Sequence, residues 1–266
     1  MILAGKTAVI TGAASGIGRA IAISLARRGC HLALADVDDA GLDRTASLAA
    51  SLGVRASCHH LDVSDEQAIA AAPARMLAEH PGVDLLVNNA GVALGGNFDQ
   101  VAEADFEWLF AINFWGVVRM TRAFLPLLKA SPEARLVNIS SLFGLIAPPG
   151  QTAYCASKFA VRGFSESLRH ELEGSSVGVT VVHPGGIATA IARNARMSQA
   201  QTEAELARLR HRFQRLLVMP PERAGEIIVE GVERNRPRIL VGSDARLAAL
   251  IERIAPVSYW KLLSRR

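Results

Sequence analysis

Short apolar runs alternate with longer amphipathic segments along this chain of 266 residues. The apolar runs are rich in β-branched residues and are bounded by small polar residues, which predicts buried strands. Seven such runs lie at 7–11, 31–36, 55–61, 84–87, 136–141, 177–182 and 238–241. Segments with helical spacing stand between them, among them 39–52, 65–79, 106–128 and 152–173. This order predicts an α/β fold with a parallel sheet that helices cover on both faces.

Two segments fit this alternation less well. Residues 190–219 are rich in Arg, Gln and Ala and look helical but weakly amphipathic, and they are too long for an ordinary connection. We therefore expect a mobile substrate lid at about 190–219. Residues 244–266 add a helical tail. We see no internal repeat or linker, and we expect one dinucleotide-binding and catalytic domain over 1–266.

The first predicted strand ends in a glycine-rich turn. The turn reads Thr11-Gly12-Ala13-Ala14-Ser15-Gly16-Ile17-Gly18 and opens a helical pattern. Backbone N–H groups and the helix N-terminus can receive a pyrophosphate in this context. The spacing G-x-x-x-G-x-G departs from the generic G-x-G-x-x-G fingerprint. A plain tight turn between a strand and a helix is the alternative.

Acidic residues end the next two predicted strands. Asp36 lies eighteen residues after Gly18, where a carboxylate can accept hydrogen bonds from ribose hydroxyls and repel a 2′-phosphate. No Arg or Lys follows it, and Ala14 occupies a turn position where a cation could have met that phosphate. Both absences predict NAD as the cofactor. Asp62 could contact the adenine, although a helix N-cap role for Ser64 and its neighbours is the alternative.

The chemistry of the chain is concentrated between 136 and 173. Tyr154 and Lys158 are four residues apart and share one face of the predicted helix, and Ser141 ends the strand before it. An ammonium beside a phenol favours the phenolate and is expected to lower the Tyr pKa from about 10. Taken alone, this pair more often lies on a solvated helix face. Asn113 is a poor residue for a helix interior, so it caps a local irregularity or has a functional partner.

Composition narrows the classes of protein. No run approaches the length of a membrane span, and no signal peptide is recognisable at the start. Cys30, Cys58 and Cys155 are widely spaced and form no metal-binding pattern, which favours a cytoplasmic protein. The last quarter, from Arg193 onward, holds 15 Lys and Arg against 8 Asp and Glu. Without a recognisable nucleic-acid motif or interleaved aromatics there, we read it as a solvated face and predict no nucleic-acid partner.

Taken together, these motifs resemble the classical short-chain dehydrogenase/reductase family up to about Gly242. They occur in the family's order and spacing, and the C-terminal part from Asp244 has no matching motif. The matching residues are Thr11-Gly12-x-x-x-Gly16-x-Gly18, Asp62, Asn88-Asn89-Ala90-Gly91, Asn113, Ser141, Tyr154-x-x-x-Lys158 and Pro184-Gly185-x-x-x-Thr189.

The resemblance implies a Rossmann-type doubly wound parallel sheet and a role for each residue. Tyr154 would be the general acid/base and Ser141 would orient the substrate oxygen. Lys158 would bind the nicotinamide ribose, and Asn113 would hold a water that relays protons from Lys158. The cofactor-binding positions would be Gly12, Ser15, Gly16, Ile17, Gly18, Asp36, Asp62, Val63, Asn89, Ala90, Gly91, Tyr154, Lys158, Pro184, Gly185, Ile187 and Thr189. A homodimer or homotetramer would form through helices 106–128 and 152–173.

We therefore predict an oxidoreductase that transfers a hydride between NAD(H) and a secondary alcohol or ketone, with a lipophilic substrate as a further hypothesis. The alternative is a dinucleotide-binding sensor or scaffold without chemistry. The identity of the substrate is not predicted. In the tail, Tyr259 and Trp260 beside basic residues suit a membrane interface. We favour the alternative that the apolar face of the tail covers the protein's own core, its substrate entrance or a neighbouring subunit.

Overall fold

In the computed structural model, which describes residues 1–197 and 217–264, the core of the fold is a seven-stranded parallel sheet. The strand order is β3-β2-β1-β4-β6-β7-β9, so the sheet grows outward in both directions from β1 and β4. The strands are β1 (Thr7–Thr11), β2 (His31–Asp36), β3 (Ala56–His60), β4 (Leu85–Asn88), β6 (Ala134–Ile139), β7 (Val177–Pro184) and β9 (Arg238–Val241). All seven predicted strands are confirmed. Reversal of the strand order beside β1 opens the crevice in which such sheets bind ligands.

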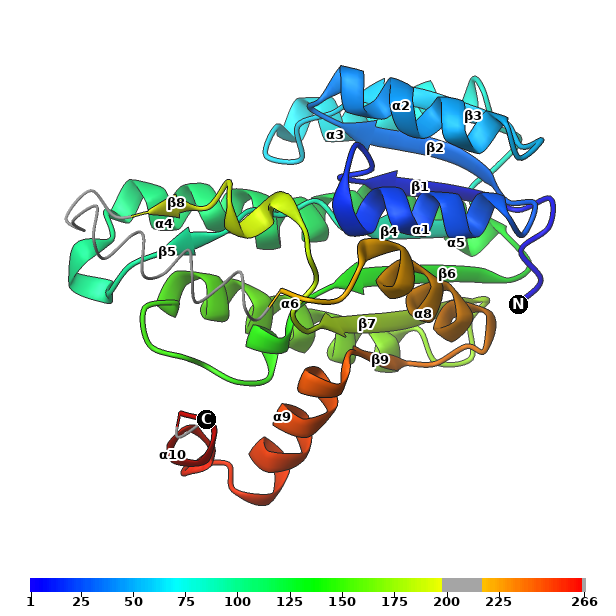
Figure 1. The fold of residues 1–266 in the computed structure, drawn as a ribbon. Coiled ribbons are helices and arrows are strands. Elements are labelled where there is room, and N and C mark those ends of the chain that lie inside the picture. The colour runs from blue at the N-terminus through cyan, green and yellow to red at the C-terminus, as the bar shows by residue number, and fades with distance from the viewer. Residues whose placement is uncertain (198–216, 265–266) are drawn as a thin grey trace.

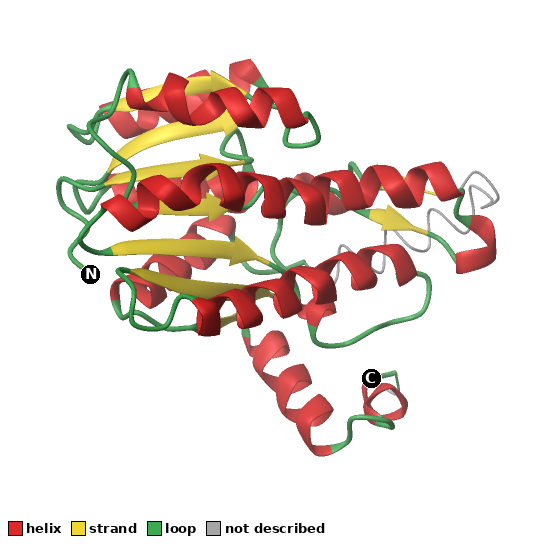
Figure 2. Cartoon of the chain, turned by 180° about the vertical axis from the view of Figure 1, so that it is seen from behind, coloured by secondary structure: helices red, strands yellow, loops and turns green. Residues whose placement is uncertain are grey.

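Helices cover both faces of the sheet (Figures 1 and 2). One layer contains α1 (Gly16–Ala26), α2 (Asp39–Ala50) and α8 (Pro221–Glu233). The other contains α3 (Glu66–Leu77), α5 (Gly116–Ala130) and α6 (Thr152–Glu171). Each face therefore has its own apolar core.

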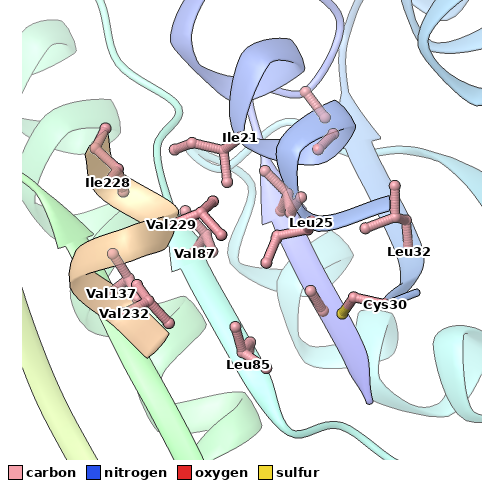
Figure 3. Packing of buried hydrophobic residues seen from close by; sticks show 14 of the residues in the cluster. Ile21, Leu25, Cys30, Leu32, Leu85, Val87, Val137, Ile228, Val229 and Val232 are labelled. Carbon is pink, nitrogen blue, oxygen red and sulfur yellow. The ribbon is translucent and has the colours of Figure 1, made fainter. Parts of the chain in front are cut away.

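Alternation along the strands explains why there are two cores. In β1, Ala8 and Ile10 pack on the α1 side, whereas Val9 packs on the α5 side. Figure 3 shows the first core, where Ile21 and Leu25 of α1 meet Ile228 and Val229 of α8 over the strands. Because both faces are buried, the strands read as continuous apolar runs in the sequence.

The long predicted helix at 106–128 is interrupted and begins earlier. It consists of α4 (Glu103–Phe110), a π-helical turn η2 (Ala111–Trp115) and α5. Asn113 lies in the π-helical turn, which accounts for a poor helix former at this place. The sequence therefore located the irregularity but not its form.

The segments near the carboxyl edge of the sheet differ most from the prediction. After a 3₁₀ turn η4 (Ala190–Ala192), β8 (Arg196–Met197) pairs with β5 (Leu94–Gly95), a two-stranded sheet that was not predicted. The helical interpretation is therefore wrong for 193–197, where no helix is present. The rest of the predicted lid, up to residue 216, lies outside the described residues. Short 3₁₀ turns η1 (Phe98–Gln100) and η3 (Leu142–Gly144) complete this edge.

The tail forms α9 (Ser243–Ile254) and α10 (Tyr259–Leu263), which extend away from the sheet (Figure 1). Only Ala245 and Ala248 of α9 are buried, whereas Leu250, Ile254 and Val257 are 55, 74 and 95% exposed. The apolar face of the tail therefore does not cover the protein's own core, which excludes one of the expected alternatives. In the described part of the chain, no helix is both long and apolar enough to cross a membrane.

Candidate active site

The glycine-rich turn after β1 is held by the end of β4. The Asn89 side chain donates to the carbonyls of Thr11 and Gly12, at 3.0 and 3.1 Å. In return, the Thr11 hydroxyl accepts from the backbone N–H groups of Asn89 and Ala90. Gly12 has φ of 66°, and a Cβ there would lie 2.8 Å from Asn89 Nδ2, so only glycine fits.

The same turn also meets the loop after β7. Gly16 has φ of 55°, and a Cβ at this residue would lie 3.2 Å from Thr189 Cγ2. Ser15 is exposed at the N-cap of α1 without a side-chain capping bond, and Ile17 is half-buried. The turn thus leaves the first backbone N–H groups of α1 open between the segments that follow β4 and β7. Such a cradle fits the phosphates of a dinucleotide.

The loop after β7 contains the predicted residues from Pro184 to Thr189. Pro184 ends β7, and Ile187 is buried and pairs with Met219. Asp244 of α9 accepts from the backbone N–H of Gly186 at 2.7 Å. The first turn of the tail therefore fixes the loop that carries Thr189, a contact that no sequence motif indicated.

Asp36 lies directly beside the glycine-rich turn, as predicted. Its carboxylate accepts from the N–H of Ala14 at 2.9 Å and from the N–H groups of Val37 and Asp38. Arg19 is a neighbour that the sequence analysis missed. Its guanidinium donates to the carbonyl of Ala14 and to the Thr45 hydroxyl. A cation thus lies near the predicted ribose site although none follows Asp36 in the sequence.

Asp62 has a partner within its own turn. Its carboxylate accepts from the backbone N–H and hydroxyl of Ser64, at 2.8 and 2.7 Å. The N-cap of α3 is Asp65, which accepts from Gln67 and Ala68. Val63 is buried against the core on the α5 side. The N-cap role that the sequence left open for Ser64 and its neighbours is therefore held by Asp65, and an adenine contact of Asp62 stays a prediction.

Ser141 is placed by two contacts at the end of β6. Its hydroxyl accepts from the N–H of Phe143 at 3.1 Å, so its own hydrogen can be donated to Tyr154 or to a substrate oxygen. Its carbonyl lies 2.9 Å from Nδ1 of His183, a fully buried residue of β7. A carbonyl can only accept, so Nδ1 carries the hydrogen, and Nε2 lacks a partner among the described residues. No motif singled out His183.

Tyr154 faces Ser141 from the first turn of α6. Desolvation raises the pKa of Tyr154 to about 12, and a hydrogen bond with Ser141 opposes this shift. The ring of Phe143 packs edge-on against Tyr154 with centroids 6.1 Å apart. The predicted lowering of the Tyr154 pKa is therefore wrong for the structure as it stands, because burial of the hydroxyl outweighs the neighbouring groups.

Lys158 and Asn113 meet at Gly91. The Lys158 ammonium is buried, donates to the carbonyl of Ile139 at 3.2 Å and lies 5.7 Å from the Tyr154 ring centroid. Burial lowers the pKa of Lys158 to about 8. A Cβ on Gly91 would lie 3.1 Å from Asn113 Oδ1 and 3.4 Å from Lys158 Nζ, so both groups approach this glycine.

Asn113 also fixes the loop after β4. Its side chain accepts from the N–H of Val92 and donates to the Val92 carbonyl, at 2.9 and 3.0 Å, and it donates to the Ser157 hydroxyl. The structure therefore brings the four predicted catalytic residues to one place. It gives Asn113 a positioning contact that the sequence did not predict.

The tail reaches the loop that precedes Tyr154. The Tyr259 hydroxyl of α10 accepts from the N–H of Ala147 at 2.9 Å. On the other side of the site, Arg196 of β8 pairs with Asp105 at 3.0 Å and stacks 3.6 Å above the Trp108 ring. Segments far apart in sequence therefore border the substrate side, which explains why local patterns did not predict its walls.

Comparison with known proteins identifies the family. The profile described as short chain dehydrogenase matches residues 6–200. The chain belongs to the short-chain dehydrogenase family. It is 46% identical over 262 residues to a Mycobacterium tuberculosis protein named as the oxidoreductase SadH, covering 98% of this chain and 94% of the relative. As a classical member of this family, the protein is an oxidoreductase.

Solved relatives support the fold and the type of cofactor. A Burkholderia phymatum short chain dehydrogenase/reductase in complex with NAD has a TM-score of 0.88 and 33% identity, covering 96% of this chain and 95% of the other. An alcohol dehydrogenase from Thermococcus sibiricus, complexed with 5-hydroxy-NADP, has a TM-score of 0.74 and 26% identity, covering 89% and 94%. The family uses NAD(H) or NADP(H), so a nicotinamide dinucleotide is the cofactor class.

Proposed function

We propose that this protein interconverts a secondary alcohol and a ketone with NAD(H). The observation that carries the proposal is the grouping of Ser141, Tyr154 and Lys158 at the carboxyl edge of the sheet, beside a glycine-rich turn that fits a dinucleotide. A bound nicotinamide would accept or supply the hydride. The remaining steps belong to the chain's own residues.

In the oxidative direction, the phenolate of Tyr154 removes the proton of the alcohol hydroxyl and becomes a neutral phenol. The Ser141 hydroxyl accepts a hydrogen bond from the Phe143 N–H and can donate its own hydrogen to the substrate oxygen. This bond holds the substrate oxygen near the side chain of Tyr154. The charge of Lys158 stabilises the phenolate before it accepts the alcohol proton, at the 5.7 Å between its ammonium and the Tyr154 ring. Because burial raises the pKa of Tyr154 and lowers that of Lys158 to about 8, we expect alcohol oxidation to accelerate with rising pH until Lys158 loses its charge near pH 8.

NAD is favoured over NADP because of Asp36. Its carboxylate accepts from the Ala14 N–H at the turn and would repel a 2′-phosphate there. Arg19 works against this preference, since its guanidinium lies beside the Ala14 carbonyl. It already donates to Thr45 and Ala14, however, so fewer of its donors are free for a phosphate.

Substrate class, assembly and location are proposed from the predicted features. The Tyr259 hydroxyl of the tail contacts the Ala147 loop, which supports a lipophilic substrate, and the exposed apolar residues of α9 support a neighbouring subunit over this helix. We retain a homodimer or homotetramer in preference to membrane contact. Cytoplasmic location stays a prediction.

A panel of secondary alcohols and ketones, from short-chain to long-chain, tests the proposal. We expect a change of nicotinamide absorbance with NAD(H) for at least one class, lost in Tyr154→Phe and retained in Leu77→Ala, a change at an exposed side chain of α3. If the protein binds NAD but no member of the panel changes the nicotinamide absorbance, the alternative of a dinucleotide-binding sensor without chemistry is favoured.

A further inference from the structure

A buried cation without a carboxylate partner lies at the edge of the sheet opposite the cofactor turn. Arg135, the second residue of β6, is only 7% exposed. Its Nη2 donates to Asn235 Oδ1, which is the one hydrogen bond that the described residues give this guanidinium. Its Nε is buried without a partner, and in the same part of the chain no ion pair involves Arg135. A buried charge normally has a counter-charge, because an unpaired one is costly to desolvate.

The surroundings hold the guanidinium in this place. A Cβ on Gly178 of β7 would collide with Arg135 Nη1, so the glycine makes room for it. Asn235 has φ of 54°, a left-handed conformation that Asn tolerates better than most residues, and its side-chain Oδ1 accepts from the guanidinium. Burial lowers the pKa of Arg135, while the charge of Glu133 opposes this effect. The position is therefore built by two strands, β6 and β7, and the turn after α8.

A cavity of about 520 Å³ adjoins Arg135. Its walls come from the end of α6 and the starts of β6 and β7, and they include Arg169, His170, Glu173 and Ser175. Arg169 forms no ion pair within the described ranges, and its Nη2 lies 3.5 Å from His170 Nε2. A cavity of this volume accommodates a small organic molecule.

The acidic residues of the wall do not neutralise both arginines. Glu133 Oε1 lies 3.6 Å from the backbone nitrogen of Met1, and its carboxylate makes no ion pair with Arg135. Glu173 is exposed, and the wall sets two carboxylates, Glu133 and Glu173, against the terminal nitrogen of Met1, two guanidinium groups and His170. The cavity thus has spare cationic donors in a partly desolvated place, which is the chemistry of an oxyanion site.

We propose that this cavity is a second ligand site, which binds a small molecule through a phosphate or carboxylate group that pairs with Arg135 and Arg169. The ligand supplies the missing counter-charge to Arg135 from the cavity side. The site is separate from the cofactor turn, since it opens at the amino ends of β6 and β7, whereas Ser141 and Thr189 follow their carboxyl ends.

Thermal unfolding with inorganic phosphate tests the site. Because phosphate can also enter the dinucleotide cradle, the protein is first saturated with NAD, and ionic strength is held constant with sodium chloride. We expect phosphate at about ten times its Kd to raise the Tm by about 3 °C. Acetate is the second probe and distinguishes a site for carboxylates from one selective for phosphate.

Two variants make the test specific. Arg135→Met keeps the length of the side chain and removes the charge, and we expect it to abolish the shift. Without phosphate, the Tm of Arg135→Met should be equal to or higher than that of the wild type, because the variant no longer buries an unpaired charge. Arg223→Met removes an exposed arginine of α8 and should retain the full shift.

Three outcomes would overturn the proposal. In the first, neither phosphate nor acetate raises the Tm of the wild type. In the second, phosphate raises the Tm of Arg135→Met as much as that of the wild type. In the third, the Tm of Arg135→Met in buffer alone is several degrees lower than that of the wild type, as expected if the arginine is purely structural. If the counter-charge is a carboxylate of a second subunit, the anions have no effect and Arg135→Met alters the oligomer size in gel filtration, which also refutes a small-molecule site.

Discussion

Polar side chains at the two edges of the parallel sheet differ in how far contacts within the fold satisfy their charges and hydrogen bonds. At the amino edge, charged groups neutralise one another, as Lys6 and Asp84 do at 2.9 Å and Arg28 does with Glu226 of α8. At the carboxyl edge, Ser141, Tyr154 and Lys158 keep hydrogen-bonding capacity that the fold does not use. The difference shows that the amino edge mainly closes the structure, whereas the carboxyl edge is left open for ligands. Arg135 is the exception at the amino edge, and that exception led to the proposed anion site.

The largest effect should come from Tyr154→Phe at the carboxyl edge. Loss of the hydroxyl removes the proton acceptor, and turnover should fall by about 10² to 10⁴-fold. NAD affinity and the free energy of unfolding should change little, because no described backbone group depends on this hydroxyl. Steady-state kinetics and urea unfolding measure the two quantities. Turnover close to that of the wild type would refute the assigned role.

Asp36→Ala should change the choice of cofactor. Removal of the carboxylate relieves repulsion of a 2′-phosphate, and we expect kcat/KM with NADP relative to NAD to rise about tenfold or more. Adding Arg19→Met to the Asp36→Ala variant removes the nearby cation. This second substitution should cancel part of the gain in kcat/KM with NADP. Equal use of both cofactors by the wild type would contradict the role of Asp36.

The amino edge is probed by Asp84→Asn. Its carboxylate accepts from the Thr7 N–H, the Ser131 hydroxyl and Lys6, and these bonds outweigh desolvation, so that the pKa of Asp84 is lowered. We expect a loss of about 2 kcal/mol in the free energy of unfolding, with kcat nearly unchanged. A large fall in kcat without a loss of stability would break the distinction between the two edges.

His183 lies at the carboxyl edge but acts only through Ser141. His183→Leu removes the Nδ1 donor to the Ser141 carbonyl, and we expect kcat to fall about tenfold while the Kd for NAD is retained. His183→Asn keeps a donor near the Nδ1 position and should restore most of the activity. His183→Gln places its donor farther out and should not. Equal activity of the Asn and Gln variants would exclude positioning through this bond.

The smallest effect concerns the amino edge at acidic pH. The Ser57 hydroxyl lies 2.7 Å from His59 Nε2 and 2.8 Å from His80 Nε2, and burial lowers the pKa of both histidines. The unfolded chain, with a His pKa of about 6.5, therefore binds more protons below that pH. Stability should be complete above about pH 6.5 and fall by about 1 kcal/mol as the pH drops toward the folded-state values.

Urea unfolding at neutral and mildly acidic pH measures this fall. The double variant His59→Gln, His80→Gln should flatten the pH dependence. His60→Gln, at a side chain 62% exposed, should not. An unchanged pH dependence in the double variant would assign the acid sensitivity to the carboxylates.

The sequence by itself determined those features of the fold and the site that depend only on residues close together in the chain. Inner strands such as β1 alternate between two cores, so their apolar runs predict burial on both faces, and Gly12 and Gly16 are required by their own positive φ angles. Tyr154 and Lys158 share a helix face because of their spacing alone. The motif resemblance supplied the roles, and the family comparison confirmed the family.

Tertiary structure decided what depends on contacts between distant segments. His183 meets Ser141 across 42 positions, and Tyr259 meets Ala147 across 112, so no local periodicity could indicate either contact. The direction of the Tyr154 pKa was predicted wrongly because spacing predicts a neighbouring charge but not the burial of a hydroxyl. Arg135 looked like an ordinary strand residue, and only packing against Gly178 and Asn235 shows that its charge is buried and unpaired.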